Sequence, residues 1–145
     1  MSSQRETVVI DATDLILGRL ASHVAKLILT GERVAVINAE NTVISGSKKN
    51  TVEKFKKRLE MRTLGSQKKA PKHARRPDTY VRRVVRGMIP WKKANGKSAY
   101  RRLKVYVGSP ERIRSPAQTI PKARKVIRPS MTVGELMQTF GWKAS

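Results

Sequence analysis

The sequence predicts a single α/β domain, and three observations lead to this fold class. Thr7–Asp11 and Arg33–Ile37 are short, β-branched runs of the kind found in buried strands. Between them, apolar residues recur at helical spacing. A strand, a helix and a strand in about 30 residues form a βαβ unit, which requires parallel strands and a right-handed crossover. The chain of 145 residues, 39% of them hydrophobic, can bury a core of its own.

The helix of this unit begins near Leu17 and ends before Gly31, because glycine readily adopts the left-handed conformation that terminates a helix. A third short strand is predicted at Thr42–Ser45. The apolar face of the helix is formed by Leu17, Leu20, Ala21, Val24 and Ile28. Its polar face carries Arg19, Ser22, His23 and Lys26.

A second helix and a basic loop occupy the next part of the chain. The helix starts at Asn50 and places Val52, Phe55 and Leu59 on one face, with cations around the rest. Gly65–Pro77 (GSQKKAPKHARRP) has five cations and no acid. Such a segment cannot build a core, so an irregular loop is predicted.

A third helix and a last strand follow the loop. Pro77 and Asp78 favour a helix start, and Pro90 ends the helix. Its apolar stripe is formed by Val81, Val84, Val85 and Met88. The cations that fall away from the stripe are Arg82, Arg83 and Arg86. Ser98–Leu103 predicts a short helical turn that leads into a strand at Lys104–Val107.

The end of the chain combines a basic arm with a helix. Ser109–Ser130 holds four of the seven prolines and six cations with one acid, which predicts an extended arm. Thr132–Glu135 has the pattern of a capping box, and Gly141 marks the helix end. The apolar residues in register between them are Leu136, Met137 and Phe140. We therefore predict one domain, 1–145, with a core at about 7–108, a basic arm at 109–130 and a C-terminal helix at 131–145.

The positive charge is concentrated in the middle of the chain. There are 32 Lys and Arg residues against 10 Asp and Glu, a net charge of +22. Residues 48–130 hold 27 of these cations and 4 of the acids, whereas residues 1–47 hold 4 cations and 5 acids. Such a field repels itself unless a polyanion neutralises it, so nucleic acid is the leading predicted partner. A charge excess that served solubility alone would not be confined to one region.

Other features of the sequence indicate where in the cell the protein is expected to work. There is no cysteine, which excludes disulfides and thiolate chemistry and fits a reducing compartment. The N-terminus lacks the cationic-then-apolar pattern of a signal peptide. No run of about 18 apolar residues could span a membrane. We expect a soluble, cytoplasmic protein with no membrane partner.

Two short motifs resemble parts of phosphate-binding loops. Gly96-Lys97-Ser98 ends like a P-loop, but Trp91 stands where a glycine is required, and a helix ended by Pro90 stands where a strand is required. A turn carrying a cation is favoured there. Ser45–Lys49 follows a strand and precedes a helix, and two interpretations stay open: a plain left-handed turn, or a contact with an RNA phosphate. No G-x-G-x-x-G follows the first strand, which argues against a dinucleotide fold.

No set of side chains predicts an active site. His23 lies on a polar helix face and His73 in the basic loop, and neither has a neighbouring carboxylate to orient it as a catalytic base. Two histidines without thiols or clustered acids make a poor metal site. Asp11 and Asp14 flank the first helix start, where capping explains them. We expect no enzyme activity, no cofactor, no metal and no small-molecule substrate.

Four aromatic residues are interleaved with the cations: Tyr80, Trp91, Tyr100 and Tyr106. Base stacking is the functional interpretation of such residues, and packing is the alternative. Packing is favoured for Tyr106, on a predicted strand, whereas the two interpretations are equally supported for Trp91. There is no RRM signature and no GXXG clamp, so sequence-specific single-strand readout is not predicted.

A long gapped pattern runs through the middle of the chain. It consists of Val85-Arg86-Gly87-Met88-Ile89-Pro90, five residues, Gly96-Lys97, five more residues, and Leu103-Lys104-Val105-Tyr106-Val107-Gly108. Shorter segments precede it: Asp11-Ala12, Leu17-Gly18-Arg19-Leu20-Ala21-Ser22, Asn38-Ala39 and Ser45-Gly46. In order and spacing, these segments resemble the universal large-subunit ribosomal protein thirteen family over about residues 7–108.

The resemblance implies a three-layer α/β/α domain on a small, mainly parallel sheet, which binds large-subunit rRNA at the solvent side of the subunit and joins early in assembly. Neighbouring large-subunit ribosomal proteins would be further partners, and no homo-oligomer is expected. Bacterial members carry His-x-Gly-Tyr-Pro-Gly-Gly where this chain has Lys68–Pro77 (KKAPKHARRP). A longer proline-rich arm and a C-terminal helix also follow Gly108. Both departures resemble the archaeal and eukaryotic branch.

The predicted rRNA contacts lie on the basic helices, the loop, the Arg86–Lys104 region and the arm. They are Lys48, Lys49, Lys54, Lys57, Arg58, Arg62, Lys68, Lys69, Lys72, His73, Arg75, Arg76, Arg82, Arg83, Arg86, Trp91, Lys92, Lys93, Lys97, Arg101, Arg102, Lys104, Arg112, Arg114, Lys122, Arg124, Lys125 and Arg128. We expect Gly65–Pro77 and Ser109–Ser130 to be mobile in the free protein and ordered on RNA. The alternatives are a nucleotide-dependent enzyme that uses Ser45–Lys49 or Gly96–Ser98, and a DNA-architectural or membrane-surface protein.

Overall fold

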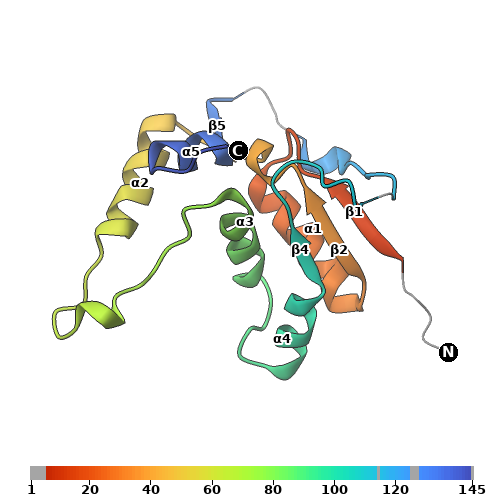
Figure 1. The fold of residues 1–145 in the computed structure, drawn as a ribbon, viewed down its shortest axis with the longest axis horizontal. Helices are drawn as coiled ribbons and strands as arrows, with labels where there is room; N and C mark the ends of the chain where they lie inside the picture. Colours follow the sequence, from red (N-terminus) through yellow and green to blue (C-terminus); the bar gives the residue numbers. More distant parts are fainter. Residues whose placement is uncertain (1–5, 114, 125–127, 145) are drawn as a thin grey trace.

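The fold is shown in Figure 1 by a computed structural model, which describes residues 6–113, 115–124 and 128–144. The strands are β1 (Thr7–Asp11), β2 (Arg33–Ile37), β3 (Val43–Ser45), β4 (Leu103–Val105) and β5 (Ser130–Thr132). The α-helices are α1 (Leu17–Thr30), α2 (Lys48–Glu60), α3 (Pro77–Arg86), α4 (Ala94–Arg101) and α5 (Val133–Thr139). Short 3-10 helices are η1 (Ala39–Asn41), η2 (Gln67–Lys69) and η3 (Pro121–Ala123).

A three-stranded parallel sheet in the order β1-β2-β4 lies at the centre of the fold. Thr7 pairs with Arg33 at one end of the β1–β2 ladder, and Asp11 pairs with Ile37 at the other. α1 connects these two parallel strands, as the predicted βαβ unit requires. The predicted α/β class on a small, mainly parallel sheet is confirmed.

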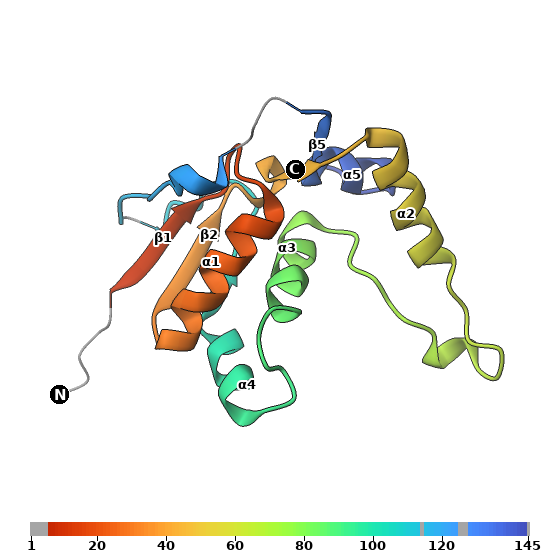
Figure 2. The same cartoon turned by 180° about the vertical axis from the view of Figure 1, so that it is seen from behind.

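Helices α1, α3 and α4 pack on one face of this sheet and enclose the main core (Figure 2). The core residues of the strands are Ile10, Val34, Val36 and Leu103, and those of the helices include Leu20, Val24, Ile28, Val85 and Ala99. As predicted, α1 ends at Gly31, which has φ 103° and donates its N–H to the Ile28 carbonyl.

The other face of the sheet is covered without a helix in the described part of the chain. Val9, Ala35 and Ile37 form a small cluster there, and Tyr106 and Ile113 pack against it. The layer that the resemblance implied on this face is therefore formed by the irregular segment after β4. The favoured packing interpretation of Tyr106 agrees with this position.

The predicted arm is partly docked on the domain. The Gln118 carbonyl accepts a hydrogen bond from the Asp11 N–H at 3.0 Å, and Gln118 donates its own N–H to the Val9 carbonyl at 2.8 Å, so it extends the sheet beyond β1. Ala123 is buried in the main core, and Ile120 packs against it. Apolar residues at these two positions hold a segment that its prolines and cations alone would leave extended.

The end of the chain returns to build a second core. β5 pairs antiparallel with β3, and this strand was not predicted from the sequence. α5 packs against α2 and α3, and Gly141 (φ 100°) follows its end as predicted, but the helix spans only Val133–Thr139 and not 131–145, because residues 130–132 form β5. The buried residues of this second core are Leu17, Ala39, Phe55, Val81, Met131, Val133, Leu136 and Met137.

Some predicted boundaries were wrong. α4 begins at Ala94, earlier than the turn predicted from Ser98, and β4 starts at Leu103 and ends at Val105. Met88 lies beyond the end of α3 and is 43% exposed, so it does not belong to the apolar stripe. The helix ends at Arg86 with Gly87 as its C-cap, and Pro90 further disfavours the helical conformation at Ile89.

Asp11 and Asp14 do not cap α1, contrary to the prediction. The helix starts after Ile16, where no side chain makes a capping hydrogen bond. Asp11 instead accepts hydrogen bonds from the Thr13 N–H at 3.0 Å, the Thr13 hydroxyl at 2.7 Å and the Asn38 side-chain amide at 3.1 Å. Burial by itself raises the pKa of Asp11, but these three hydrogen bonds bring the pKa below its usual value.

Candidate nucleic-acid interface

Helix α3 separates a buried stripe from a charged surface. Pro77 at its start and Asp78 in its first turn favour helix formation here. Val81 and Val85 are buried in the two cores. Arg83 and Arg86 are exposed, and Arg82 is half-buried. The helix therefore presents its arginines on the side away from the cores.

The Gly96-Lys97-Ser98 motif lies within α4, so the prediction of a turn was wrong. Gly96 is buried, and a Cβ atom at this position would lie 2.1 Å from the carbonyl oxygen of Pro90. The glycine allows the chain at Pro90 and Trp91 to pass directly against the helix. Close packing thus explains the residue that made the motif look like a P-loop.

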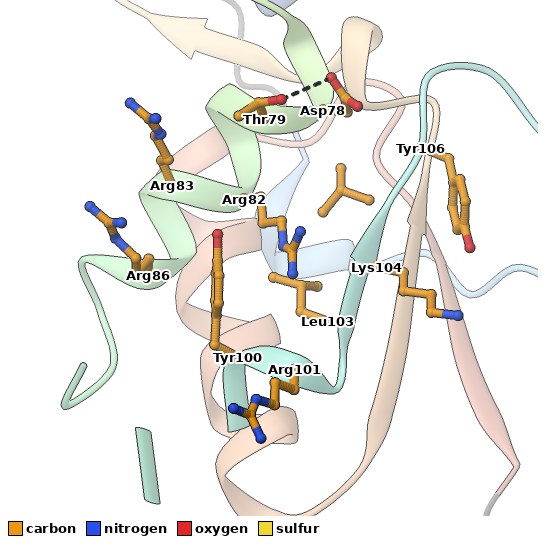
Figure 3. Close-up of a pocket in the computed structure, with 11 residues that line it drawn as sticks. Asp78, Thr79, Arg82, Arg83, Arg86, Tyr100, Arg101, Leu103, Lys104 and Tyr106 are labelled. Atoms are coloured by element: carbon orange, nitrogen blue, oxygen red, sulfur yellow. Dashed lines mark hydrogen bonds between the residues drawn. The ribbon is translucent and has the colours of Figure 1, made fainter. Parts of the chain in front are cut away.

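A cleft of about 570 Å³ lies between α3, α4 and β4 (Figure 3). Five cations from these elements line it: Arg82, Arg83, Arg86, Arg101 and Lys104. Asp78 is the acid on its wall, and it pairs with Arg76 at 3.2 Å. Within the described residues, none of the five cations forms an ion pair. The cleft therefore suits a ligand that carries several negative charges.

Two aromatic rings orient arginines at this cleft. The guanidinium carbon of Arg82 lies 4.5 Å from the centre of the Tyr100 ring, and that of Arg86 lies 5.3 Å from the centre of the Trp91 ring. The two rings meet edge to face, with 5.0 Å between their centres and 80° between their planes. Such contacts restrict the guanidinium groups before any ligand arrives. The Nε atom of Arg82 is buried and has no hydrogen-bond partner among the described residues.

A second group of cations lies on α2. Phe55 is the buried residue of this helix, and Lys54, Lys57 and Arg58 are exposed. Before the helix, Gly46 has φ 117°, so the left-handed turn considered for Ser45–Lys49 is present. Ser47 caps the helix by accepting the Asn50 N–H.

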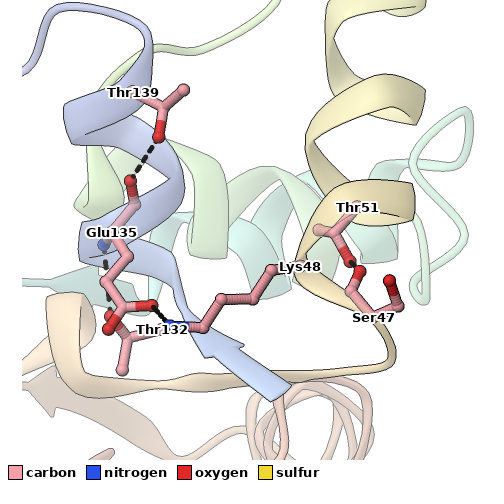
Figure 4. Close-up of polar contacts among 6 residues, drawn as sticks. All are labelled: Ser47, Lys48, Thr51, Thr132, Glu135 and Thr139. Carbon is pink, nitrogen blue, oxygen red and sulfur yellow. Dashed lines mark hydrogen bonds and ion pairs between the residues drawn. The ribbon is translucent and has the colours of Figure 1, made fainter. Parts of the chain in front are cut away.

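The N-terminus of α2 is tied to α5 (Figure 4). The Lys48 ammonium group lies 3.4 Å from a carboxylate oxygen of Glu135. The Thr132 hydroxyl accepts the Glu135 N–H at 3.1 Å, which is half of the predicted capping box. The Glu135 side chain extends to Lys48, so an ion pair takes the place of the second half.

The basic loop returns past His73 to α3. His73 lines a cavity of about 260 Å³ together with Phe55, Arg58, Tyr80 and Arg83. Its Nε2 atom is buried without a hydrogen-bond partner among the described residues. Burial raises the pKa of Tyr80 in this cavity, and the charge of Arg58 opposes that rise. Arg83 donates a hydrogen bond to the Lys72 carbonyl, which links the loop to α3.

The cations of the arm form a third group. The Lys122 carbonyl accepts a hydrogen bond from Arg19 at 3.1 Å, and Arg124 forms a β-bridge with Leu15. Gln118 of the arm pairs with β1 at one edge of the sheet, and the cleft borders β4 at the other edge. The two charged regions therefore lie at opposite edges of the sheet. Figure 1 shows the same separation.

The predicted site residues fall into three groups along the chain, and the first two meet at Arg83, which lines both the α3 cleft and the His73 cavity. The cleft and its surroundings hold Arg82, Arg83, Arg86, Trp91, Lys92, Lys93, Lys97, Arg101, Arg102 and Lys104. The α2 and loop group holds Lys48, Lys49, Lys54, Lys57, Arg58, Arg62, Lys68, Lys69, Lys72, His73, Arg75 and Arg76. The arm holds Arg112, Lys122, Arg124 and Arg128. Arg114 and Lys125 lie outside the described residues.

Sequence reasoning missed Arg33. This exposed residue lies in the nearly neutral N-terminal third, yet it lines a second charged cleft together with Arg101 and Lys104. Arg33 was not predicted because it lies outside residues 48–130, where the cations are concentrated. The pairing of β2 with β4 brings them together.

Two general features of the described residues bear on function. None of their groups of His, Cys, Asp and Glu side chains could hold a metal ion. None of the described helices combines the length and the apolar content that crossing a membrane requires.

Comparison with known proteins relates this geometry to a family. Residues 5–112 match the family model of ribosomal protein L13. The chain belongs to the ribosomal protein L13 family. This is a family of structural ribosomal proteins, and the chain is accordingly not an enzyme.

Relatives of the L13 family extend the match beyond residue 112. The large ribosomal subunit protein uL13 of Methanococcoides burtonii is 44% identical over 139 residues, with 93% of this chain and 98% of the relative covered. That of Methanococcus maripaludis is 42% identical over 137 residues, covering 94% and 98%. That of Methanopyrus kandleri is 50% identical over 105 residues, covering 72% and 64%. These archaeal relatives confirm the predicted branch of the family.

Proposed function

We propose that this chain is a structural constituent of the large ribosomal subunit and binds large-subunit rRNA through the cleft between α3, α4 and β4. The L13 relatives are large ribosomal subunit proteins, which supports the ribosomal role. The binding role is supported by the cleft itself, where five cations from α3, α4 and β4 converge. Its acid, Asp78, is already paired with Arg76. In this proposal the protein acts in the cytoplasm.

The chemistry of the cleft suits the RNA backbone. Guanidinium groups bind phosphate oxygens in a bidentate manner, which an ammonium group cannot do. A-form RNA conceals its major-groove base edges, so most contacts are with phosphates, riboses and helix shape. Binding releases counterions, and affinity therefore falls as the salt concentration rises.

The other two groups of cations extend the proposed interface. α2 and its loop contact further rRNA segments, because their cations are exposed and, apart from Lys48 and Arg76, unpaired among the described residues. The arm contacts rRNA and neighbouring large-subunit proteins, and the protein joins during subunit assembly as a monomer. Neither a small molecule nor a membrane is a partner in this proposal.

Binding to large-subunit rRNA fragments across a salt series tests the proposal. Replacement of both Arg83 and Arg86 by Gln removes two cations of the cleft, and Lys26→Gln, on the exposed face of α1, is the matched control. We expect the double variant to bind more weakly and to lower the salt slope by roughly 0.7–0.9 for each phosphate that the protein no longer neutralises. A wild-type response that is flat in salt, or equal affinity for tRNA, would contradict the proposal.

Sedimentation of the endogenous protein tests the ribosomal role separately. Co-migration with the large subunit at low and at moderate salt is expected. Migration as a free protein under both conditions would exclude a stable place in the subunit.

A further inference from the structure

A second charged cleft, of about 380 Å³, lies where the parallel strands begin. It is lined by Thr7, Arg33, Val34, Arg101, Arg102 and Lys104. None of these residues is acidic or aromatic. The cleft is thus a concave surface with four cations.

The topology of the sheet explains why the cations converge. Parallel strands begin at the same edge of a sheet, and here Thr7 pairs with Arg33 while Val34 pairs with Leu103. Arg33 at the start of β2 is therefore brought beside the residues that flank the start of β4. The strand order thus places Arg33, from the N-terminal third of the chain, next to Arg101, Arg102 and Lys104.

The cations of this cleft are held but not neutralised. Arg102 donates a hydrogen bond to the Ile28 carbonyl at 3.0 Å, which fixes its guanidinium group at the C-terminal end of α1. In the described part of the chain, neither Glu6 nor Glu32 forms an ion pair with any of the four. Four fixed or exposed cations without acids form a site for an anion.

The two clefts adjoin each other. Arg101 and Lys104 line both, so the charged surface passes from α3 across β4 to the start of β2. The absence of an aromatic wall from the second cleft favours contact with phosphates and not with a stacked base.

We propose that the second cleft binds phosphates of the same RNA strand that occupies the α3 cleft. The backbone leaves the α3 cleft, passes Lys104 and Arg101, and places its next phosphates against Arg33 and Arg102. This inference rests on the proposed rRNA binding and extends it to the edge of the sheet.

Substitution of Arg33 tests the inference. Arg33 is exposed, and Arg33→Gln removes its charge while keeping much of the length of the side chain. Lys26→Gln is the control, because it removes one exposed cation elsewhere on the surface. We expect Arg33→Gln to weaken binding of large-subunit rRNA fragments about tenfold and to lower the salt slope by about one. Inorganic phosphate at the same ionic strength should not displace the RNA, since a free anion lacks the contacts along the strand.

The outcomes separate this inference from the proposed function. If Arg33→Gln binds like the wild type while the Arg83 and Arg86 double variant loses affinity, the second cleft is not a phosphate site although rRNA binding stands. If the wild type shows no preference for rRNA, the proposed function fails instead. Displacement of the RNA by inorganic phosphate would identify the cleft as a free-anion site and overturn the inference.

Tethered cleavage gives an independent readout. The chain has no cysteine, so Arg33→Cys, Arg86→Cys and Lys26→Cys each create one attachment point for an iron chelate that cuts nearby RNA. We expect cuts from positions 33 and 86 to fall in one continuous stretch of the same strand, and few cuts from position 26. Cuts from position 33 on an unrelated strand, or none, would overturn the inference. Far-UV circular dichroism of each variant verifies that it is folded.

Discussion

Gly96 shows how strongly one position can constrain the region that carries the cleft. The atom that limits it belongs to the backbone of Pro90, which cannot rotate away as a flexible side chain could. A larger residue would force α4 away from the turn at Pro90, and with it Tyr100, whose ring holds Arg82. The glycine therefore matters for the geometry of the arginines as well as for stability.

We predict that Gly96→Ala lowers the free energy of unfolding by about 1–3 kcal/mol, the usual cost of overpacking. Urea denaturation provides the measurement. Gly18→Ala is the matched control, because a Cβ atom at Gly18 meets nothing within 4 Å and the residue lies in helix α1. The control should be neutral or gain up to about 1 kcal/mol from helix propensity. Equal stability of Gly96→Ala and wild type would contradict the close approach.

Asp11 links the strand end to the following turn, and its pKa gives it a pH dependence. Because the hydrogen bonds bring the folded-state pKa below the usual value of 3.8, the ionised form stabilises the fold above that value. This stabilisation is lost as the pH falls through the folded-state pKa. We predict that the wild type loses stability below about pH 4 and that Asp11→Asn loses less over the same range, as thermal unfolding between about pH 2 and 6 can measure. Identical pH profiles would show that the carboxylate contributes nothing.

At the scale of the elements, α2 depends on α5. Phe55 lies between Tyr80 of α3, at 5.9 Å between ring centres, and Phe140 at the end of α5, at 4.9 Å. An amphipathic helix with one buried residue gains little from its own propensity, so its position is set by these partners. The basic surface of α2 is consequently placed by residues near the end of the chain.

We predict that Leu136→Ala costs about 2–5 kcal/mol, because the side chain is fully buried in the second core. Gln138→Ala, exposed on the same helix, should change stability by less than about 0.5 kcal/mol. If α5 holds α2, Leu136→Ala should also speed trypsin cleavage within Lys54–Arg58 more than cleavage in Lys68–Arg76. Uniform acceleration at both places would contradict a specific support of α2.

The loop and the arm are expected to respond differently to protease. Gly65–Pro77 has exposed cations and little regular structure, so we still predict rapid trypsin cleavage there that bound rRNA slows. The arm should be cut more slowly than this loop in the free protein, because Gln118 anchors it to the sheet and Ala123 anchors it to the core. Mass spectrometry of the early fragments distinguishes the two segments.

Local patterns explain which elements could be predicted from the sequence. β1, α1, β2 and α3 were predicted because each carries its pattern within a short window. β5 was not, because Ser130–Thr132 is three residues long and is stabilised by β3, far away in the sequence. The cations of the α3 cleft were all predicted from charge, but their convergence and the part of Arg33 depend on the order β1-β2-β4, which local patterns do not contain.

At the scale of the whole molecule, two cores share their border. Val84 of α3 and Val105 of β4 pack against both clusters, so neither core can be opened without exposing part of the other. We therefore propose that the described residues fold as one unit, which the following prediction tests.

We predict one cooperative unfolding transition. The chain has two tryptophans: Trp91 contacts Tyr100 beside the main core, and Trp142 packs against the second core. Trp142→Phe leaves a reporter of the first region, and Trp91→Phe leaves a reporter of the second. Their urea transitions, monitored by fluorescence and each compared with circular dichroism of the same variant, should have coincident midpoints. Separate midpoints within one variant would show that the two cores unfold independently.

The return of the C-terminal segment to both cores has a consequence for biosynthesis. Protein chains are made from the N-terminus, and early segments can fold while later ones are still being added. Here the βαβ unit is available early, but Ala123, β5 and α5 are synthesised after α2 and the basic loop. The strongly cationic helix α2 and the loop after it therefore emerge before α5, against which α2 packs, has been made. A newly made chain therefore passes through a stage in which α2 is synthesised but unplaced, and α2 reaches its position only once α5 has emerged.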